Sequence, residues 1–373
     1  MTTTGIPKPG HLAALTSMRF YAALVVVLVH AAAIFPVLPV VERAASLGYV
    51  GVGFFFTLSG FVLMWSRRED DRPRWFYGRR FARVWPAHAF MTLAIVPVLL
   101  FEGKTPPWAA LPLVLAFVHV WMPPAEWHYA FNGPSWSLGA EAFFYLLFPV
   151  LARVTIASRR APLLLASAAA ALLLSGAAMV TALFPDAFWG FLLYLNPVYR
   201  LGEFVLGMCL AALIRQGWLP RWRLSYAVAA AVVSYVAIVL FAPVDSEGAV
   251  PRVLADLGML PAFLALLAAG AGSDLRGRTR WLARGWPVRL GEWSYSLYLV
   301  HMAVLLCAAT LFADSGLSEL RWTWALIPLL VLAIGASGLL YTLVERPAER
   351  RIRARLTARP TRGAARPTAV RAG

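Results

Sequence analysis

Two residues in the first long apolar stretch have types and a spacing that suit group-transfer chemistry. Arg19 and His30 lie 11 residues apart in this stretch, residues 18–34. In an α-helix, 11 residues make three turns plus about 20°, so both side chains share one face and lie roughly 16 Å apart along the axis. A guanidinium binds phosphate-like anions, and an imidazole can act as a general base. The alternatives are an interfacial anchor for Arg19 and a structural role for His30.

The composition of the chain shows which environment surrounds such a helix. Of the 373 residues, 60% are hydrophobic and 14% are charged. A soluble domain has about 45–50% apolar and about 25% charged residues, so this chain has too little polar surface for a water-soluble globule. The excess of 34 Lys and Arg over 18 Asp and Glu suits the basic loops of a membrane protein. We therefore exclude a nucleic-acid-binding protein and a disordered chain.

Ten apolar runs are long enough to cross the hydrocarbon layer, which takes about 20 helical residues. We predict an all-α polytopic membrane protein, a bundle of about ten transmembrane helices. An eleventh run, residues 108–122, is shorter and contains Pro112 and His119, so we predict a re-entrant or half-inserted segment. The predicted spans are residues 18–34, 47–65, 84–101, 136–156, 161–184, 199–214, 224–241, 253–271, 290–312 and 322–344.

The basic residues orient these helices. If the N-terminus is cytoplasmic and residues 108–122 do not cross, most of the 34 basic residues fall on the inside, as the positive-inside rule requires. We predict a multi-pass protein of the bacterial cytoplasmic (inner) membrane with both termini cytoplasmic. Residues 1–352 are predicted to form one transmembrane domain, and residues 353–373 a basic, disordered cytoplasmic tail. The first span contains Arg19 and His30, so we do not expect a cleaved signal peptide.

A second histidine is predicted to lie at the depth of the first. His301 follows Ser294 and Tyr298 at helical spacing, in a span that also enters from the inside. An ionisable residue within a span normally faces the bundle interior or a wet cavity. We therefore expect His30 and His301 to share one cavity. A structural hydrogen bond between helices is the alternative for His301.

Three of the other charged residues within predicted spans are further candidates. Glu141 is in a helix that enters from the opposite face, and its carboxylate could orient His30 and raise its basicity, or bind the acceptor. Arg200 and Glu203 are i,i+3 neighbours and could simply neutralise one another.

An arginine cluster lies at the cytoplasmic mouth of the third predicted span. Arg79 and Arg83 are four residues apart, so they share a helix face, and Arg80 is adjacent. Guanidinium groups match phosphate geometry well. The number of arginines in this inside loop is explained by topology alone, and only their spacing indicates a ligand.

These motifs resemble, in order, those of integral-membrane acyltransferase family 3, the membrane O-acyltransferases of bacterial surface sugars and natural products. Arg19 and His30 are similar to its Arg-x10-His signature, and Val50-Gly-Val-Gly-Phe-Phe-Phe-Thr-Leu-Ser-Gly-Phe61 resembles its second-span motif. Gly53 departs from the pattern, because many relatives have Asp there. The similar landmarks that follow are residues 77–86, 136–141, 199–207, 294–301 and 344–347.

The resemblance implies that an acyl group, expected to be acetyl, moves from acyl-CoA to a hydroxyl group. The expected acceptor is a sugar or a hydroxylated, macrolide-like natural product rather than a cell-wall polymer, because the appended hydrolase-like domain of some members is missing. We expect no tightly bound cofactor, no metal and no nucleic-acid partner; the partners are the lipid bilayer, acyl-CoA and the acceptor. The predicted site residues are His30 as general base and Glu141 (catalytic), Arg19, Arg79, Arg80 and Arg83 (donor-binding), and His301, Tyr298, Ser294, Arg200 and Glu203 (further candidates).

Two alternatives stay open at this stage. An acyl-histidine intermediate competes with direct transfer, and neither Cys209 nor Cys307 is placed to act as a nucleophile. A transporter or flippase of a small molecule or lipid-linked sugar could also use ten helices, buried charges and a re-entrant segment. The oligomeric state cannot be inferred from the sequence.

Overall fold

The computed structural model describes residues 10, 12–68, 72–122, 125–184, 186–242, 251–279 and 281–357. Within these ranges the secondary structure is entirely helical. In the described part of the chain, ten helices are long and apolar enough to cross a membrane. The protein is therefore a multi-pass membrane protein, and the predicted fold class is confirmed.

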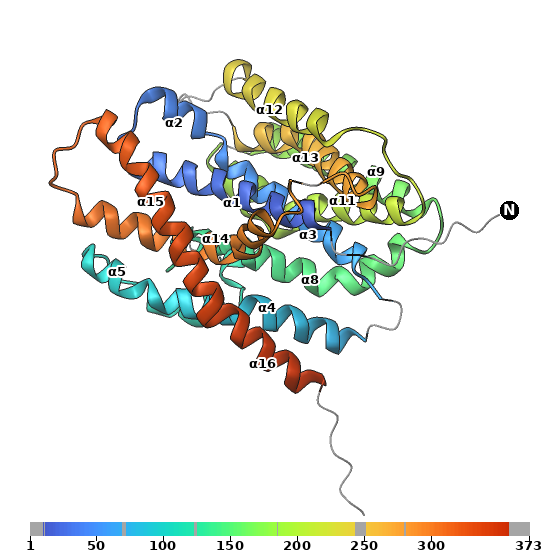
Figure 1. The fold of residues 1–373 in the computed structure, drawn as a ribbon, viewed down its shortest axis with the longest axis horizontal. Coiled ribbons are helices and arrows are strands. Elements are labelled where there is room, and N and C mark those ends of the chain that lie inside the picture. Colours follow the sequence, from blue (N-terminus) through green and yellow to red (C-terminus); the bar gives the residue numbers. More distant parts are fainter. Residues whose placement is uncertain are drawn as a thin grey trace, which may run out of the picture.

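Each predicted span corresponds to one long helix or to two consecutive ones. In Figure 1, α2 and α5 lie at one end of the bundle and α16 lies towards the other. The long helices are α1 (Ala13–Ile34), α3 (Gly51–Trp65), α4 (Pro73–Ala94), α8 (Trp136–Thr155), α9 (Ala161–Leu183), α11 (Pro197–Arg215), α12 (Leu224–Phe241), α13 (Arg252–Leu275), α14 (Gly285–Leu311) and α15 (Glu319–Leu340). The short ones are α2 (Pro39–Ala45), α5 (Val96–Phe101), α6 (Leu111–Leu115), α7 (Ala125–His128), α10 (Asp186–Trp189) and α16 (Arg346–Thr357).

Helix α4 begins well before the predicted third span. Pro73 is at its first position, where proline suits a helix because that residue needs no hydrogen-bond donor. The Tyr77 hydroxyl donates to the Leu146 carbonyl oxygen on α8 at 3.0 Å, which fixes the first turns. The arginine cluster is therefore held on a rigid helix, and not on a loop.

The segment of residues 108–122, for which we predict a re-entrant or half-inserted segment, is broken into short pieces. It consists of a 3-10 turn, α6 and a second 3-10 turn. Two side chains of α4 bind its backbone: Trp85 donates to the Leu115 carbonyl oxygen at 3.0 Å, and His88 Nε2 lies 2.9 Å from the Val114 carbonyl oxygen. Irregular backbone at membrane depth is tolerated where it is buried in protein, and these bonds meet that condition.

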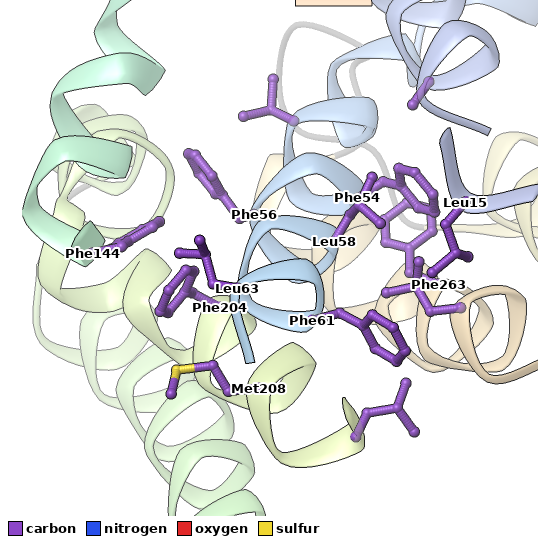
Figure 2. Close-up of a cluster of buried hydrophobic side chains, with 14 of the residues drawn as sticks. Leu15, Phe54, Phe56, Leu58, Phe61, Leu63, Phe144, Phe204, Met208 and Phe263 are labelled. Atoms are coloured by element: carbon purple, nitrogen blue, oxygen red, sulfur yellow. The ribbon is translucent and has the colours of Figure 1, made fainter. Parts of the chain in front are cut away.

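Helix α3 forms the centre of the bundle. Its apolar side chains point in several directions, and Figure 2 shows them beside residues of neighbouring helices, among them Phe144 of α8 and Phe263 of α13. The ring of Phe56 lies 5.1 Å from that of Phe144, and the ring of Phe54 lies 5.5 Å from that of Phe263. Because most side chains of α3 are buried against other helices, it is a fixed reference for the helices that carry the site.

Glycines allow the closest helix crossings. A Cβ atom at Gly60 of α3 would lie 1.9 Å from the Phe204 carbonyl oxygen, and one at Gly207 of α11 would lie 1.9 Å from the Thr57 carbonyl oxygen. At the crossing of α1 and α14, a Cβ at Gly291 would lie 1.9 Å from the Thr16 carbonyl oxygen. Small residues that let backbones approach are typical of helix packing in membranes.

Substituting Gly291→Ala is expected to push α14 away from α1. The methyl group would collide with backbone, which cannot rotate aside, so we expect a loss of stability of about 1–3 kcal/mol and reduced activity, because α1 and α14 carry His30 and His301. Thermal unfolding of the purified protein measures the first effect. Gly335→Ala is the matched control, because a Cβ there would meet nothing within 4 Å; equal midpoints for the two variants would contradict the proposed crossing.

Helix α16 extends into the segment predicted to be a disordered tail. It runs to Thr357 and carries an i,i+4 ion pair of 2.6 Å between Arg353 and Glu349. Leu356 packs against Gly78 of α4, because a Cβ atom added at Gly78 would lie 2.7 Å from Leu356 Cδ1. The prediction of disorder was therefore wrong for residues 353–357, because the polar composition conceals this contact with α4. Residues 358–373 lie outside the described ranges.

Candidate functional site

A small cavity of about 130 Å³ lies between α1, α3, α4, α8 and α14. Arg19, Arg80 and Arg83 line it, together with polar side chains of α8 and α14. Helices α8 and α14 run in opposite directions, so Ser137 near the start of α8 meets Tyr298 far along α14. The cavity therefore has Ser137 and Tyr298 at one end and guanidinium groups towards the other.

The arginines of this cavity differ in their partners. Arg83 forms ion pairs with Glu345 and, at 3.4 Å, with Glu349. Within the described ranges, Arg19 and Arg80 have no carboxylate at ion-pair distance, and Arg80 Nε is buried without a hydrogen-bond partner. Arg19 and Arg80 are therefore the cations available to an anionic ligand. Arg79, which the sequence grouped with them, does not line the cavity.

Glu141 lies in the arginine-lined cavity. Its Oε1 accepts a hydrogen bond from Ser59 of α3 at 2.8 Å and another from Tyr145, one turn along α8. Among the described residues, Glu141 makes no hydrogen bond with His30. The ring of His30 instead contacts that of His301. The depth of Glu141 on its helix follows from the sequence, but the direction in which α8 presents its side chain does not.

His30 and His301 meet across α1 and α14, as expected from their matched depth. His30 Nδ1 lies 2.8 Å from the Val26 carbonyl oxygen and 3.3 Å from His301 Nε2. The ring centroids are 5.1 Å apart. His301 is fully buried, whereas His30 is partly exposed.

The hydrogen bonds of the two rings assign one tautomer to both. A carbonyl oxygen only accepts, so His30 Nδ1 carries the proton that it shares between Val26 and His301. His301 Nδ1 lies 3.2 Å from the Leu297 carbonyl oxygen and is protonated for the same reason, which leaves His301 Nε2 as the acceptor. Nε2 of His30 therefore keeps its lone pair, as a general base requires.

Tyr298 separates the cavity from the histidine pair. Its hydroxyl group lies 2.8 Å from Ser137 Oγ and donates to the Pro134 carbonyl oxygen at 2.8 Å. Its ring centroid is 5.9 Å from that of His301 and 6.2 Å from that of Phe55. Tyr298 lines the cavity, but neither histidine does. Ser294, the remaining candidate on α14, donates to the Gly291 carbonyl oxygen at 2.7 Å and supports the helix itself.

Arg200 and Glu203 belong to a buried cluster with a third member. Arg200 Nη1 lies 3.0 Å from Glu203 Oε1 and 2.5 Å from Asp256 Oδ2 of α13. The guanidinium also lies over the rings of Phe56 and Tyr194, 5.2 and 5.3 Å from their centroids. All three charged side chains are at most 4% exposed.

Sequence reasoning missed Asp256, although it could have been found. Asp256 is an acidic residue within a predicted span, and the rule applied to Glu141 covers it equally. The departure at Gly53 also has a structural counterpart: a Cβ there would lie 3.4 Å from both Glu203 carboxylate oxygens and 3.5 Å from Arg200 Nη2. An acidic side chain at position 53 would therefore reach the same guanidinium that Asp256 binds here.

Comparison with known proteins identifies the family. The family described as "Acyltransferase domain" matches residues 12–342. The chain is 34% identical to the acyltransferase MdmB of Streptomyces mycarofaciens, over 92% of this chain and 93% of that protein. It is 23% identical to the peptidoglycan O-acetyltransferase OatA of Listeria monocytogenes serovar 1/2a, over 69% of this chain and 45% of OatA. No solved structure matches. The chain therefore belongs to the family of membrane acyltransferases defined by this domain, as the order of its motifs indicated.

Proposed function

We propose that the protein is an O-acyltransferase that moves an acyl group, expected to be acetyl, from acyl-CoA to a hydroxyl group of a sugar or macrolide-like natural product. It acts in a bacterial cytoplasmic membrane with both termini in the cytoplasm. The main support is a spatial arrangement of the described residues. Guanidinium groups without an ion-pair partner line a cavity, Tyr298 lies at its end, and the histidine pair lies directly behind Tyr298. The O-acetyltransferase activity in the name of OatA supports a hydroxyl acceptor.

The donor is proposed to bind with its phosphates at Arg19 and Arg80. Among the described residues, neither cation has a carboxylate at ion-pair distance, so phosphates would not have to displace an existing ion pair. The pantetheine arm then extends along the cavity towards Tyr298. The axial separation of roughly 16 Å between Arg19 and His30 on α1 is of the right order for that arm, which places the thioester near the histidines once the Tyr298 ring turns aside.

His30 is proposed to act as the general base. The acceptor hydroxyl gives its proton to Nε2 of His30 while its oxygen bonds to the carbonyl carbon of the thioester. The carbon–sulfur bond then breaks, and the CoA thiolate takes the proton back from His30. His301 accepts the Nδ1–H hydrogen bond of His30 throughout, so it orients the ring and stabilises the imidazolium that forms between the two proton transfers.

The arginine pair gives a direct test of this assignment. Changing Arg19→Gln and Arg80→Gln together is expected to raise KM for acetyl-CoA by about 10–100-fold, since a hydrogen bond to a charged group is worth about 1.5–3 kcal/mol. With S-acetylpantetheine, which has no nucleotide phosphates, the variant and the wild type should have similar KM values. Release of free thiol in the presence of acceptor measures both.

The control and the alternatives follow from the same assay. Arg74→Gln removes a charge from the exposed start of α4, where the guanidinium lies over the Trp75 ring outside the cavity, and should leave KM unchanged. An unaltered KM for acetyl-CoA in the double variant would contradict the donor site. A transporter or flippase would release no thiol from acetyl-CoA under any of these conditions.

A further inference from the structure

A second cavity, of about 1300 Å³, lies on the other side of α1 from the histidines. It is a groove between α1 and α12, with α3 and α13 forming its floor. Met18, Ala22 and Val25 of α1 line it, and it shares no lining residue with the arginine cavity. The groove is therefore separate from the proposed donor path.

The groove is reached from the hydrocarbon layer. Its wall on α12 consists mainly of apolar side chains, and Val228, Val232 and Val236 are 45%, 56% and 46% exposed. Exposed apolar side chains along a membrane span face lipid tails. The lined stretch of α12 from Ser225 to Val236 spans about 16 Å, close to half of the roughly 30 Å hydrocarbon core. The groove thus matches one leaflet in length.

One end of the groove is positively charged. Arg223, Arg276 and Arg278 line this end, beside Trp222 and Trp281. Tryptophans that are about half exposed, as these are, are typical of the depth of lipid headgroups. No carboxylate lines the groove within the described ranges. The guanidinium groups therefore meet the groove where a headgroup would lie.

The local contacts leave two of these arginines available. Arg276 Nη1 donates to the Pro220 carbonyl oxygen at 2.9 Å, so this arginine is partly committed to the fold. Arg223 and Arg278 are exposed. The nearby carboxylate of Asp274 accepts from the Ala14 N–H at 2.9 Å and from Thr279, and so it caps α1. At the opposite end, Tyr235 donates to the Ala44 carbonyl oxygen at 2.8 Å, and none of the described residues that line that end is charged.

We propose that the groove binds an anionic glycerophospholipid, with its phosphate between Arg223 and Arg278 and its acyl chains along α12. The apolar walls, the open side towards lipid and the single basic end match a molecule with two tails and one anionic head. Acyl-CoA has a long polar nucleotide, and a neutral natural product has no anion for the arginines. The bound lipid fills the space behind α1 and so holds in place the helix that carries His30.

Thermal unfolding of the full-length protein in nanodiscs tests this site. Phosphatidylglycerol added to phosphatidylcholine is expected to raise the unfolding midpoint by several degrees, because a ligand that binds the folded state stabilises it. Arg223→Gln with Arg278→Gln should remove this shift and weaken phosphatidylglycerol retention, measured by native mass spectrometry, on the order of 30-fold. Arg159→Gln with Arg160→Gln removes equal charge from another loop and should keep the shift.

A second pair of variants tests the groove without altering charge. Ala229 lines the groove and is exposed, whereas its neighbour Ala230 is exposed but does not line it. Ala229→Phe should displace the lipid, and Ala230→Phe should retain it. The proposal is overturned if phosphatidylcholine stabilises as well as phosphatidylglycerol does, if inorganic phosphate alone reproduces the shift, if both arginine pairs have equal effects, or if the two Phe variants retain lipid equally.

Discussion

Replacing His30 with Ala is expected to lower kcat for acetyl transfer by about 10²–10⁴, the usual contribution of general-base catalysis. Of the two paired histidines, His30 is the one whose Nε2 combines a free lone pair with a partly open position, because His301 is fully buried and uses its Nε2 to accept from His30. The measurement is steady-state transfer to a saturating acceptor. Unfolding midpoints of variant and wild type should agree within a few degrees, since His30 packs no part of the apolar core.

Two companion measurements separate the roles of the histidines. His301→Ala should lower kcat by about tenfold, the value of one hydrogen bond, and His301→Gln should restore part of it because an amide oxygen can accept from His30. Incubation with labelled acetyl-CoA without acceptor distinguishes direct transfer from an acyl-histidine route. A labelled protein adduct that is lost in the His30 variant would refute the base mechanism, as would near-normal activity of His30→Ala.

Replacing Arg200 with Met is expected to destabilise the fold by at least about 3–5 kcal/mol, the usual consequence of removing one partner from a buried ion pair. Glu203 and Asp256 would face each other in a buried site without a cation, and the cluster that joins α11 to α13 would be lost. The fraction of monodisperse protein after extraction and the unfolding midpoint measure this effect.

A neutral version of the whole cluster provides the control. Arg200→Met combined with Glu203→Gln and Asp256→Asn leaves no uncompensated charge, so we expect this triple variant to regain much of the lost stability. A single variant as stable as the wild type would mean that the ion pairs contribute little. A triple variant as unstable as the single one would mean that packing of the guanidinium on Phe56 and Tyr194, and not charge, holds the cluster.

The sequence predicted the membrane spans well because span length and apolar composition depend on the bilayer alone. It also placed His30 and His301 at one depth, since both helices enter from the same side. It could not predict which helices touch. At the crossing of α3 and α11, Gly60 and Gly207 each leave room for a backbone carbonyl oxygen of the other helix. These contacts join residues that are far apart in the chain.

Side-chain direction was the other quantity that the sequence left undetermined. From its depth, Glu141 could orient His30 or bind the acceptor, but the rotation of α8 directs it to Ser59 and Tyr145. Arg79 and Arg83 share a helix face, yet the cavity is lined by Arg80 and Arg83 because α4 turns that edge towards α1 and α8. Periodicity gives the angle between two residues of one helix, and neighbouring helices set the absolute angle.

The position of Tyr298 has a consequence for the membrane as a barrier. An enzyme that admits a coenzyme from one compartment to the middle of the bilayer risks becoming a leak for protons and ions. The phenol ring, tethered to Ser137 and Pro134 and seated on Phe55, closes the end of the arginine-lined cavity. If the donor enters as proposed, that ring has to turn aside before any connection past it opens, so the resting arrangement would keep the two compartments electrically insulated from each other.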